Sequence, residues 1–183
     1  IHITTARVHD VNIMDLIPYE KGSFYVADKA YTDFNRLHRI HANESFFVIR
    51  AKENLQFHRM YSRAVDKTKG VINDQIGRLL SPRSRTEYPE KLRRIKYYDA
   101  EHDLDLVFLT NNMDLKATEI AFLYKKRWEV ELFFKWMKQH LKIKSFWGVT
   151  LNAVKIQMYC AIIAYCLVAL VGYKLKVGRP IYE

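Results

Sequence analysis

The chain has 183 residues, 49% of them hydrophobic, and 30 lysine and arginine residues stand against 20 aspartate and glutamate residues. This length and hydrophobic content are typical of about one folded domain and argue against an intrinsically disordered chain. The formal net charge of +10 favours a polyanionic partner, either a nucleic acid or an anionic membrane, over a basic soluble protein without such a partner.

The two cysteines of the chain, Cys160 and Cys166, both lie inside an apolar run. Two thiols exclude a disulfide-stabilised scaffold and fit a reducing compartment. Six residues apart on a helix, they point to different sides, so we expect core packing and not a metal pair. The first residues do not resemble a signal peptide. The sequence begins at Ile1, already inside an alternating strand pattern, and ends at GRPIYE without residues that would end a structural element. We therefore expect a fragment of a longer protein.

The N-terminal part of the chain predicts strands that alternate with short helices. The expected elements are a strand over 1–9, a short helix or turn over 10–20, a buried strand over 23–28 that ends at Asp28, a helix over 32–43 and a buried strand over 46–51. Two strands joined through a helix by short links indicate a parallel α/β unit.

Residues 52–112 have a different character. They are polar and basic, and are interrupted by Gly70, Gly77, Pro82 and Pro89. The stretch KLRRIKYYDAEHDLDLVFLTNN predicts a β-hairpin in which residues 92–98 pair with residues 105–110. We therefore expect a β-rich subdomain inserted in the chain.

The remaining residues, 113–183, are predicted to be helical. The stretch ATEIAFLYKKRWEVELFFKWMKQHL has no glycine or proline, and residues 145–148 interrupt the pattern. Residues 156–173 then form a run of 18 residues without a charge. A transmembrane helix needs about 20 apolar residues, and Gln157 and Gly172 dilute this run. We expect a buried core helix, with a membrane span as the alternative.

One helical segment, residues 124–138, combines charged and aromatic side chains. At about 100° per residue, Tyr124, Arg127, Glu131 and Lys138 fall on one narrow stripe. One interpretation is an ordinary Arg127–Glu131 ion pair between neighbouring turns. The other is a carboxylate that holds a hard divalent cation while its cationic neighbours bind phosphate. The geometry of the stripe does not decide between them.

The same segment has an apolar face beside the stripe, made of Val130, Phe133, Phe134 and Met137. We expect this face to pack on a sheet. Trp128 and Lys135 flank the stripe on its other side.

The spacing Y-x2-R-x3-E-x6-K over residues 124–138 resembles the signature of a large group of bacterial insertion-sequence transposases with a DDE catalytic domain. VADKAYTDFNRL resembles the second acidic motif of that group, D-R-G-Y, which stands here as Asp28-Lys29-Ala30-Tyr31. Further similar stretches are VHDVNIMDLIPYE, FFVIRAKENLQF, KLRRIKYYD, LVFLTNN and LKIKSFWG. The resemblance covers nearly the whole chain.

The resemblance implies an α/β fold. Its ribonuclease-H-like core would be partial here, with the first two strands missing, over residues 1–51. A β-rich insertion over 52–112 and C-terminal helices over 113–183 would follow, the latter carrying the signature helix.

The resemblance also implies residue roles. Asp28 and Glu131 would be catalytic and would ligate two Mg²⁺ or Mn²⁺ ions, which hard carboxylate oxygens suit. Arg127 and Lys138 would bind DNA phosphates, Tyr124 would hydrogen-bond the DNA backbone, and Trp128 would stack on a base. The basic clusters over 83–96 and 125–144 are expected to contact the DNA backbone.

The implied function is DNA transposition, with metal-dependent strand cleavage and strand transfer at insertion-sequence ends. The implied partners are double-stranded DNA, at the transposon ends and the target, and a second copy in a synaptic homodimer. We expect a bacterial, cytoplasmic, nucleoid-associated protein without a membrane partner. The alternatives are a non-catalytic DNA-binding remnant and a basic membrane-associated protein anchored through residues 156–173.

Two departures from the family pattern affect these expectations. The first catalytic Asp of the family lies upstream of anything in this sequence, so we expect the chain to be inactive on its own. Lys29-Ala30 stands where Arg-Gly is usual, and alanine would strain a turn that required positive φ.

Overall fold

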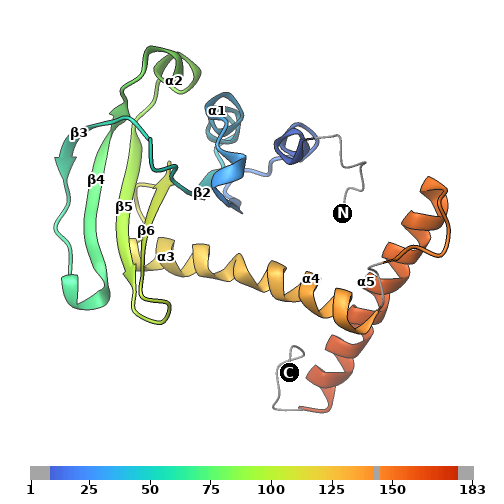
Figure 1. The fold of residues 1–183 in the computed structure, drawn as a ribbon. Helices are drawn as coiled ribbons and strands as arrows, with labels where there is room; N and C mark the ends of the chain where they lie inside the picture. Colours follow the sequence, from blue (N-terminus) through green and yellow to red (C-terminus); the bar gives the residue numbers. More distant parts are fainter. Residues whose placement is uncertain (1–8, 142–144, 177–183) are drawn as a thin grey trace. The chain divides into compact units, whose positions relative to one another are not determined.

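The structure is a computed structural model that describes residues 9–141 and 145–176 (Figure 1). Its contacts separate two compact units, His2–Arg127 and Trp128–Glu183. The first unit contains all the strands of the described residues, and the second contains two helices.

The first unit is built on one six-stranded sheet with the strand order β1-β2-β6-β5-β4-β3 (Figure 1). Its strands are β1 (Phe24–Ala27), β2 (Phe46–Arg50), β3 (Phe57–Ser62), β4 (Val71–Leu79), β5 (Leu92–Asp99) and β6 (Leu104–Thr110). Its helices are η1 (Asp10–Asp15), η2 (Lys29–Tyr31), α1 (Phe34–Ala42), η3 (Lys67–Lys69), α2 (Pro82–Glu87) and α3 (Ala117–Lys126). The pair β1–β2 is parallel, and every other pair is antiparallel. The mixed α/β fold class is therefore confirmed.

The predicted strand–helix–strand unit is present as β1, α1 and β2. The two strands run parallel, with Phe24 opposite Phe46 and Ala27 opposite Ile49. β2 is buried as expected, but every residue of β1 is only partly buried. The reason is that β1 is the edge strand of the described sheet, with a neighbour on one side. Residues 1–8 of the expected first strand lie outside the described residues.

The predicted hairpin is also present, as β5 and β6, which pair with Tyr98 opposite Asp105. The strands of residues 52–112 continue the same sheet, because β6 pairs with β2 as well as with β5. The division of the chain into a core, an insertion and a helical remainder stays a prediction.

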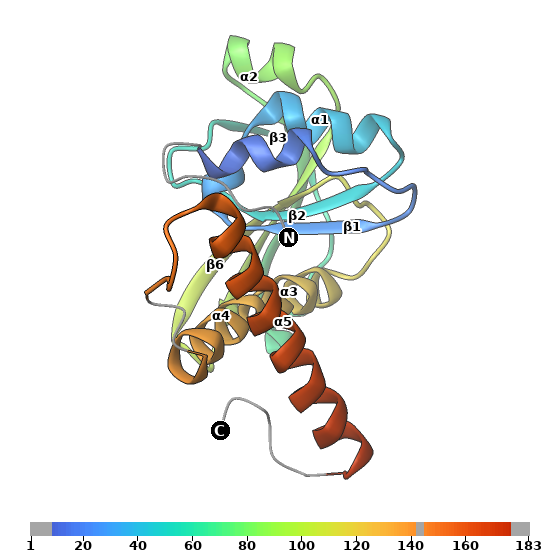
Figure 2. The same ribbon diagram turned by 90° about the vertical axis from the view of Figure 1, so that its right-hand side faces the viewer.

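Helices α1 and α3 lie on opposite faces of this sheet (Figure 2), and an apolar core lies beneath each of them. Side chains alternate along a strand, so Phe47 and Ile49 of β2 join the core beneath α1, and Val48 between them joins the core of α3. The residues of α1 and α3 in these cores are Leu37, Ile40, Ala117, Ile120, Ala121 and Tyr124.

The second unit consists of α4 (Trp128–His140) and α5 (Leu151–Lys174). Trp136 and Met137 of α4 form a buried cluster with Ala161 of α5, and Phe133 packs at its edge. The ring of Tyr165 lies 4.7 Å from that of Phe133 and 5.2 Å from that of Trp136. Within this unit Phe133 and Met137 of the predicted apolar face pack on a helix, where a sheet was expected, whereas Val130 and Phe134 are exposed. The prediction failed because an apolar face does not specify the partner that covers it.

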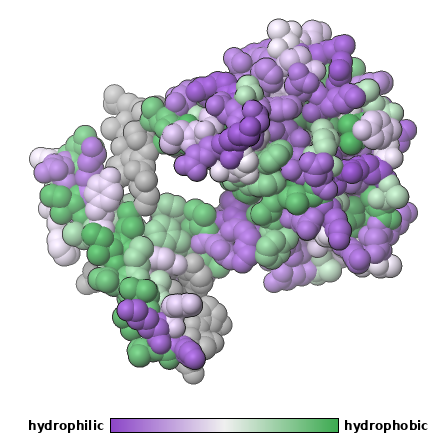
Figure 3. All heavy atoms as spheres, turned by 180° about the vertical axis from the view of Figure 1, so that it is seen from behind, coloured by the Kyte–Doolittle hydropathy of each residue, from purple (hydrophilic) through white to green (hydrophobic). Residues whose placement is uncertain are grey.

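The prediction of a buried core helix over residues 156–173 is wrong for the described residues. α5 forms, but Ala161 is its one buried residue within the described part of the chain, whereas Ile163 and Leu167 are 58% and 57% exposed. Hydrophobic side chains gather along this helix in Figure 3. Cys160 and Cys166, which we expected in the core, are also exposed. The physical reason is that α5 is apolar on all sides, and a single neighbouring helix covers only one side.

By length and composition alone, α5 could cross a membrane. Core helices of soluble proteins can be equally long and apolar.

Candidate active site and nucleic-acid interface

Asp28 lies directly after β1, at the end where the chain leaves the sheet. Its Oδ1 accepts a hydrogen bond of 2.6 Å from the backbone N–H of Ala30, which caps η2 and fixes the carboxylate orientation. No hydrogen bond to Oδ2 is found within the described residues. In open α/β sheets, ligands bind beyond the carboxyl ends of the parallel strands, and Asp28 occupies that end of β1. Its catalytic role stays a prediction.

The alanine that follows Asp28-Lys29 is accommodated without backbone strain. Ala30 lies inside η2. The non-glycine residues with positive φ in the described chain are Glu44, Asp103 and Lys176, so Ala30 is not among them. The substitution of the usual glycine therefore does not distort the turn beside Asp28.

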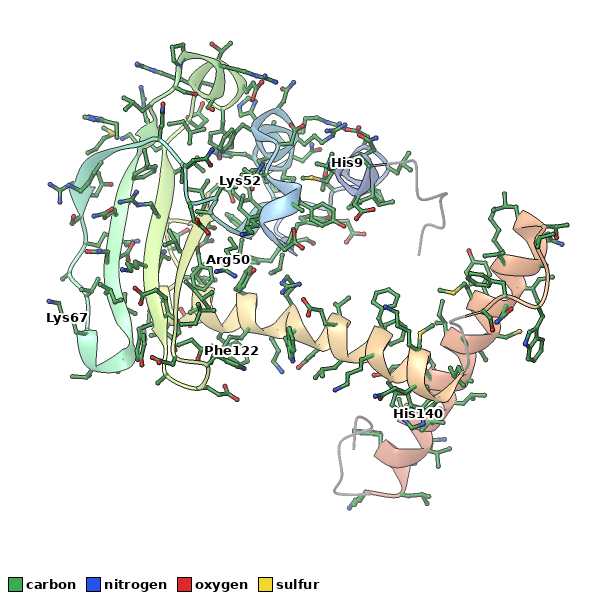
Figure 4. All side chains as sticks on the ribbon, in the orientation of Figure 1. His9, Arg50, Lys52, Lys67, Phe122 and His140 are labelled. Carbon is green, nitrogen blue, oxygen red and sulfur yellow. The ribbon has the colours of Figure 1, made fainter. Side chains whose placement is uncertain are left out.

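An open groove that includes Lys29, the residue after Asp28, is rich in cationic side chains. It is lined by Lys29, Arg50, Lys52, Arg94 and Lys96, together with Ala51, Glu53, Leu55, Asn73, Gln75, Asp105 and Val107. Arg50 and Lys52, both labelled in Figure 4, come from the end of β2 and the segment after it. Five cations face two carboxylates, so the groove favours an anion. Arg94 and Lys96 belong to the basic cluster over 83–96, whose predicted contact with DNA stays a prediction. The sequence did not predict that Lys29, Arg50 and Lys52 join them, because these residues are brought together only by the strand order.

Tyr124 and Arg127 stand at the end of α3 in the first unit. Tyr124 is 8% exposed, and its ring lies 4.9 Å from that of Phe108. The Cζ atom of Arg127 lies 5.4 Å from the centre of the same tyrosine ring. Tyr124 therefore belongs to the core and supports the guanidinium of Arg127 through a cation–π contact. Its predicted contact with DNA remains untested.

Trp128, Glu131 and Lys138 lie on α4 in the second unit, and all three are exposed. The segment over 124–138 that we expected as one helix is two, because α3 ends at Lys126 and α4 begins at Trp128. The signature therefore spans both units. That Glu131 and Asp28 share one metal site stays a prediction.

A second acidic group lies at the turn between β5 and β6, where Asp99, Glu101 and His102 come close enough to share a cation. A lysine already occupies this position, since Lys125 Nζ lies 2.6 Å from Asp99 Oδ1 and 3.4 Å from Glu101 Oε2. His102 Nδ1 lies 2.9 Å from Asp99 Oδ2. We interpret this group as an ion-pair network that attaches α3 to the hairpin, not as a metal centre.

Asp99→Asn is expected to lower the free energy of unfolding at pH 7 by about 1 to 3 kcal/mol, because the Lys125 ammonium loses the negative charge of its hydrogen-bond partner. Burial raises the pKa of Asp99, but hydrogen bonds from Lys125 and His102 outweigh it and lower the pKa below its usual value. A lowered pKa stabilises the fold above about pH 4, and this contribution is lost as the pH falls through the folded-state pKa.

Urea unfolding between pH 7 and pH 2 measures this effect. The parent protein should lose stability on acidification, and Asp99→Asn should lose less. Glu101→Gln is the matched control, because the Glu101 side chain is 72% exposed and its pair is worth about 1 kcal/mol or less. Equal acid sensitivity of the parent and Asp99→Asn would contradict the assignment.

Comparison with known proteins gives consistent matches. A family model described as a transposase DDE domain matches residues 1–167. A protein of Sinorhizobium fredii, named as a transposase, is 38% identical over 183 residues, which cover 98% of this chain and 51% of that protein. A Geobacillus stearothermophilus protein, named as a transposase for an insertion sequence element, is 35% identical over 144 residues, which cover 78% of this chain and 37% of that protein.

A Synechocystis protein, also named as a transposase for an insertion sequence element, is 28% identical over 167 residues. These residues cover 86% of this chain and 44% of that protein. The chain thus spans about half the length, or less, of the curated relatives it matches.

Proposed function

The chain belongs to the transposase DDE domain family, and from this premise we propose that it supplies metal ligands and DNA contacts for cleavage and strand transfer at insertion-sequence ends. The α/β fold is consistent with the ribonuclease-H-like core of such a domain. The observation that carries the proposal is Asp28, held at the carboxyl end of β1 with its carboxylate fixed by the Ala30 N–H; the next residue, Lys29, lines a groove rich in cations.

The residues of the chain fit a hard divalent cation. Asp28 offers a carboxylate whose orientation is fixed by the Ala30 N–H, and carboxylate oxygens suit Mg²⁺ or Mn²⁺. Asp28 and Glu131 would hold these ions, with two expected in the complete site. The chemistry that two such ions supply when bound is activation of water or a 3′-hydroxyl and neutralisation of charge on the leaving oxygen.

The remaining residues of the site bind and position DNA. Arg50 and Lys52 would neutralise the phosphates that approach Asp28. Arg127, supported by the ring of Tyr124, would donate to a phosphate, to which a guanidinium can bind bidentately. Lys138 would contact the DNA backbone, and Trp128, 53% exposed, would stack on a base.

We propose that this chemistry belongs to a transposase longer than the present chain, as the length of the relatives supports. The 183 residues alone are expected to be inactive. The substrates would be the ends of the element and a target duplex, and two copies would pair two ends in a synaptic dimer.

The test is metal-dependent cleavage of an end-containing DNA duplex by the transposase that contains this chain. Cleavage with Mg²⁺ or Mn²⁺ that stops on chelation, while DNA binding persists, is the expected result. Binding without cleavage under any divalent metal would support the alternative of a DNA-binding remnant.

Lys138→Ala is expected to weaken binding to end DNA and to flatten its salt dependence. Removing one phosphate contact reduces the slope of log K against log[salt] by about 0.9. Fluorescence anisotropy over a series of salt concentrations measures both quantities. Lys67→Ala is the control, since Lys67 is exposed in η3 and labelled in Figure 4 at the far end of β4. An unchanged slope for Lys138→Ala would contradict the assignment.

A further inference from the structure

We propose that the sheet surface formed by β4 and β5 binds the phosphate backbone of DNA through Arg94 and Lys96, on the face of the sheet that α1 covers. This inference rests on the proposed function, and it singles out two residues of the basic cluster over 83–96, outside the acidic motif and the signature.

The geometry of β5 places these two cations together. Arg94 and Lys96 are two residues apart on one strand, so they point to the same face, about 7 Å apart along it. Leu92, two residues before Arg94, also points to this face and is buried in the core beneath α1. The apolar core thus ends at Leu92, and the same face of the strand continues as the cationic wall of the groove.

The neighbours of Arg94 position its charge without neutralising it. Its Nε and Nη2 donate to Gln75 Oε1 at 3.2 and 2.7 Å, and its Cζ lies 4.9 Å from the centre of the Phe57 ring. No carboxylate pairs with it among the described residues. Burial, followed by the positive charge of Arg59, lowers the pKa of Arg94 from its usual value.

This arrangement favours an anionic ligand. A half-buried guanidinium is stabilised most by a carboxylate partner, yet the partner of Arg94 is the neutral amide of Gln75. Lys96 differs, because it lies 2.7 Å from Asp105 and its charge is partly compensated. Arg94 is therefore the principal anchor of the surface, and Lys96 is the secondary one.

The distribution of the cations identifies a polyanion as the ligand. The groove receives Lys29 from the turn after β1, Arg50 and Lys52 from the end of β2, and Arg94 and Lys96 from β5. Five cationic residues from three separate segments thus line one groove, whereas a single small anion needs donors that converge on one point. Repeated phosphates with the charge density of nucleic acid match a lining of this kind.

The decisive experiment is the double variant Arg94→Gln/Lys96→Gln in the transposase that contains this chain. We expect weaker binding to end DNA and a salt-dependence slope reduced by between about 1 and 2, since each phosphate contact contributes about 0.9. Lys67→Gln/Lys69→Gln removes two exposed charges from η3 and should leave both quantities unchanged. An unchanged affinity and slope in the Arg94/Lys96 variant would overturn the inference.

A second variant tests the same surface by a gain of binding. Asp105→Asn removes the carboxylate that compensates Lys96, so it should tighten DNA binding and steepen the slope by up to about one contact. Weaker or unchanged binding of Asp105→Asn would contradict a DNA contact at Lys96. If the parent protein itself does not bind end DNA, the proposed function is wrong. If the parent binds and the variants at Arg94, Lys96 and Asp105 bind unchanged, only the inference about this surface is wrong.

Discussion

Asp28→Asn and Glu131→Ala are each expected to abolish metal-dependent cleavage, by about 10³-fold or more, while leaving DNA binding in place. Asp28→Asn replaces one carboxylate oxygen of the proposed metal site by an amide NH₂, and Glu131→Ala removes a whole carboxylate. Where several residues act as one catalytic unit, losing any one of them abolishes nearly all activity. Asn at position 28 retains an Oδ1 acceptor for the Ala30 N–H, so the cap of η2 is preserved. The loss should therefore come from metal binding and not from the turn.

Matched controls separate the loss of a ligand from the loss of a negative charge. Glu53→Gln removes an almost fully exposed carboxylate from the groove that Lys29 lines. Glu129→Gln removes an exposed carboxylate from the first turn of α4, two residues before Glu131. Both controls should cleave end DNA at close to the parental rate. Full cleavage by Glu131→Ala would show that the catalytic assignment is wrong.

The sequence predicts the parts of the fold that depend on local patterns. Strand alternation and helical spacing locate β1, α1, β2 and the β5–β6 hairpin, because burial of one face imposes a period on the residues of each element. The position of Asp28 follows directly, since the acid comes straight after an apolar strand.

The parts that the sequence did not predict depend on which elements pack together. The apolar composition of α5 indicates a helix but not the partner that covers it, so its exposure was not foreseen. Arg94 reaches Gln75 only because β4 and β5 pair in a particular register. Tyr124 matches a DNA-binding signature, yet its ring packs on Phe108, which lies 16 residues earlier in the chain and is brought near by the sheet.

Arg93→Met is expected to reduce the free energy of unfolding by about 3 to 5 kcal/mol, the usual effect of removing one partner of a buried ion pair. The Arg93 and Asp74 side chains are 1% and 5% exposed. Nε and Nη2 of Arg93 donate to the two carboxylate oxygens at 2.8 and 2.7 Å, and Nη1 donates to the Leu115 carbonyl at 2.6 Å. The variant leaves a buried carboxylate without a partner.

This arginine also fixes the start of the helix that carries Tyr124. Leu115 precedes α3 by two residues, and Asn112, whose backbone carbonyl also faces Arg93 Nη1 at 3.4 Å, accepts the Leu115 N–H through its side chain. The double variant Asp74→Leu/Arg93→Met removes the unpaired charge and should recover much of the lost stability. The recovery should be incomplete, because the Leu115 carbonyl loses its donor in both variants.

Urea unfolding of the two variants and the parent measures both effects. Arg83→Met is the control, because Arg83 pairs with Glu87 on α2 while its own side chain is 88% exposed, and such a pair contributes about 0 to 1 kcal/mol. If Arg93→Met lost no more stability than Arg83→Met, the pair would not be a determinant of the fold. If the double variant were as unstable as Arg93→Met, the bond to Leu115, and not the unpaired charge of Asp74, would be the dominant contribution.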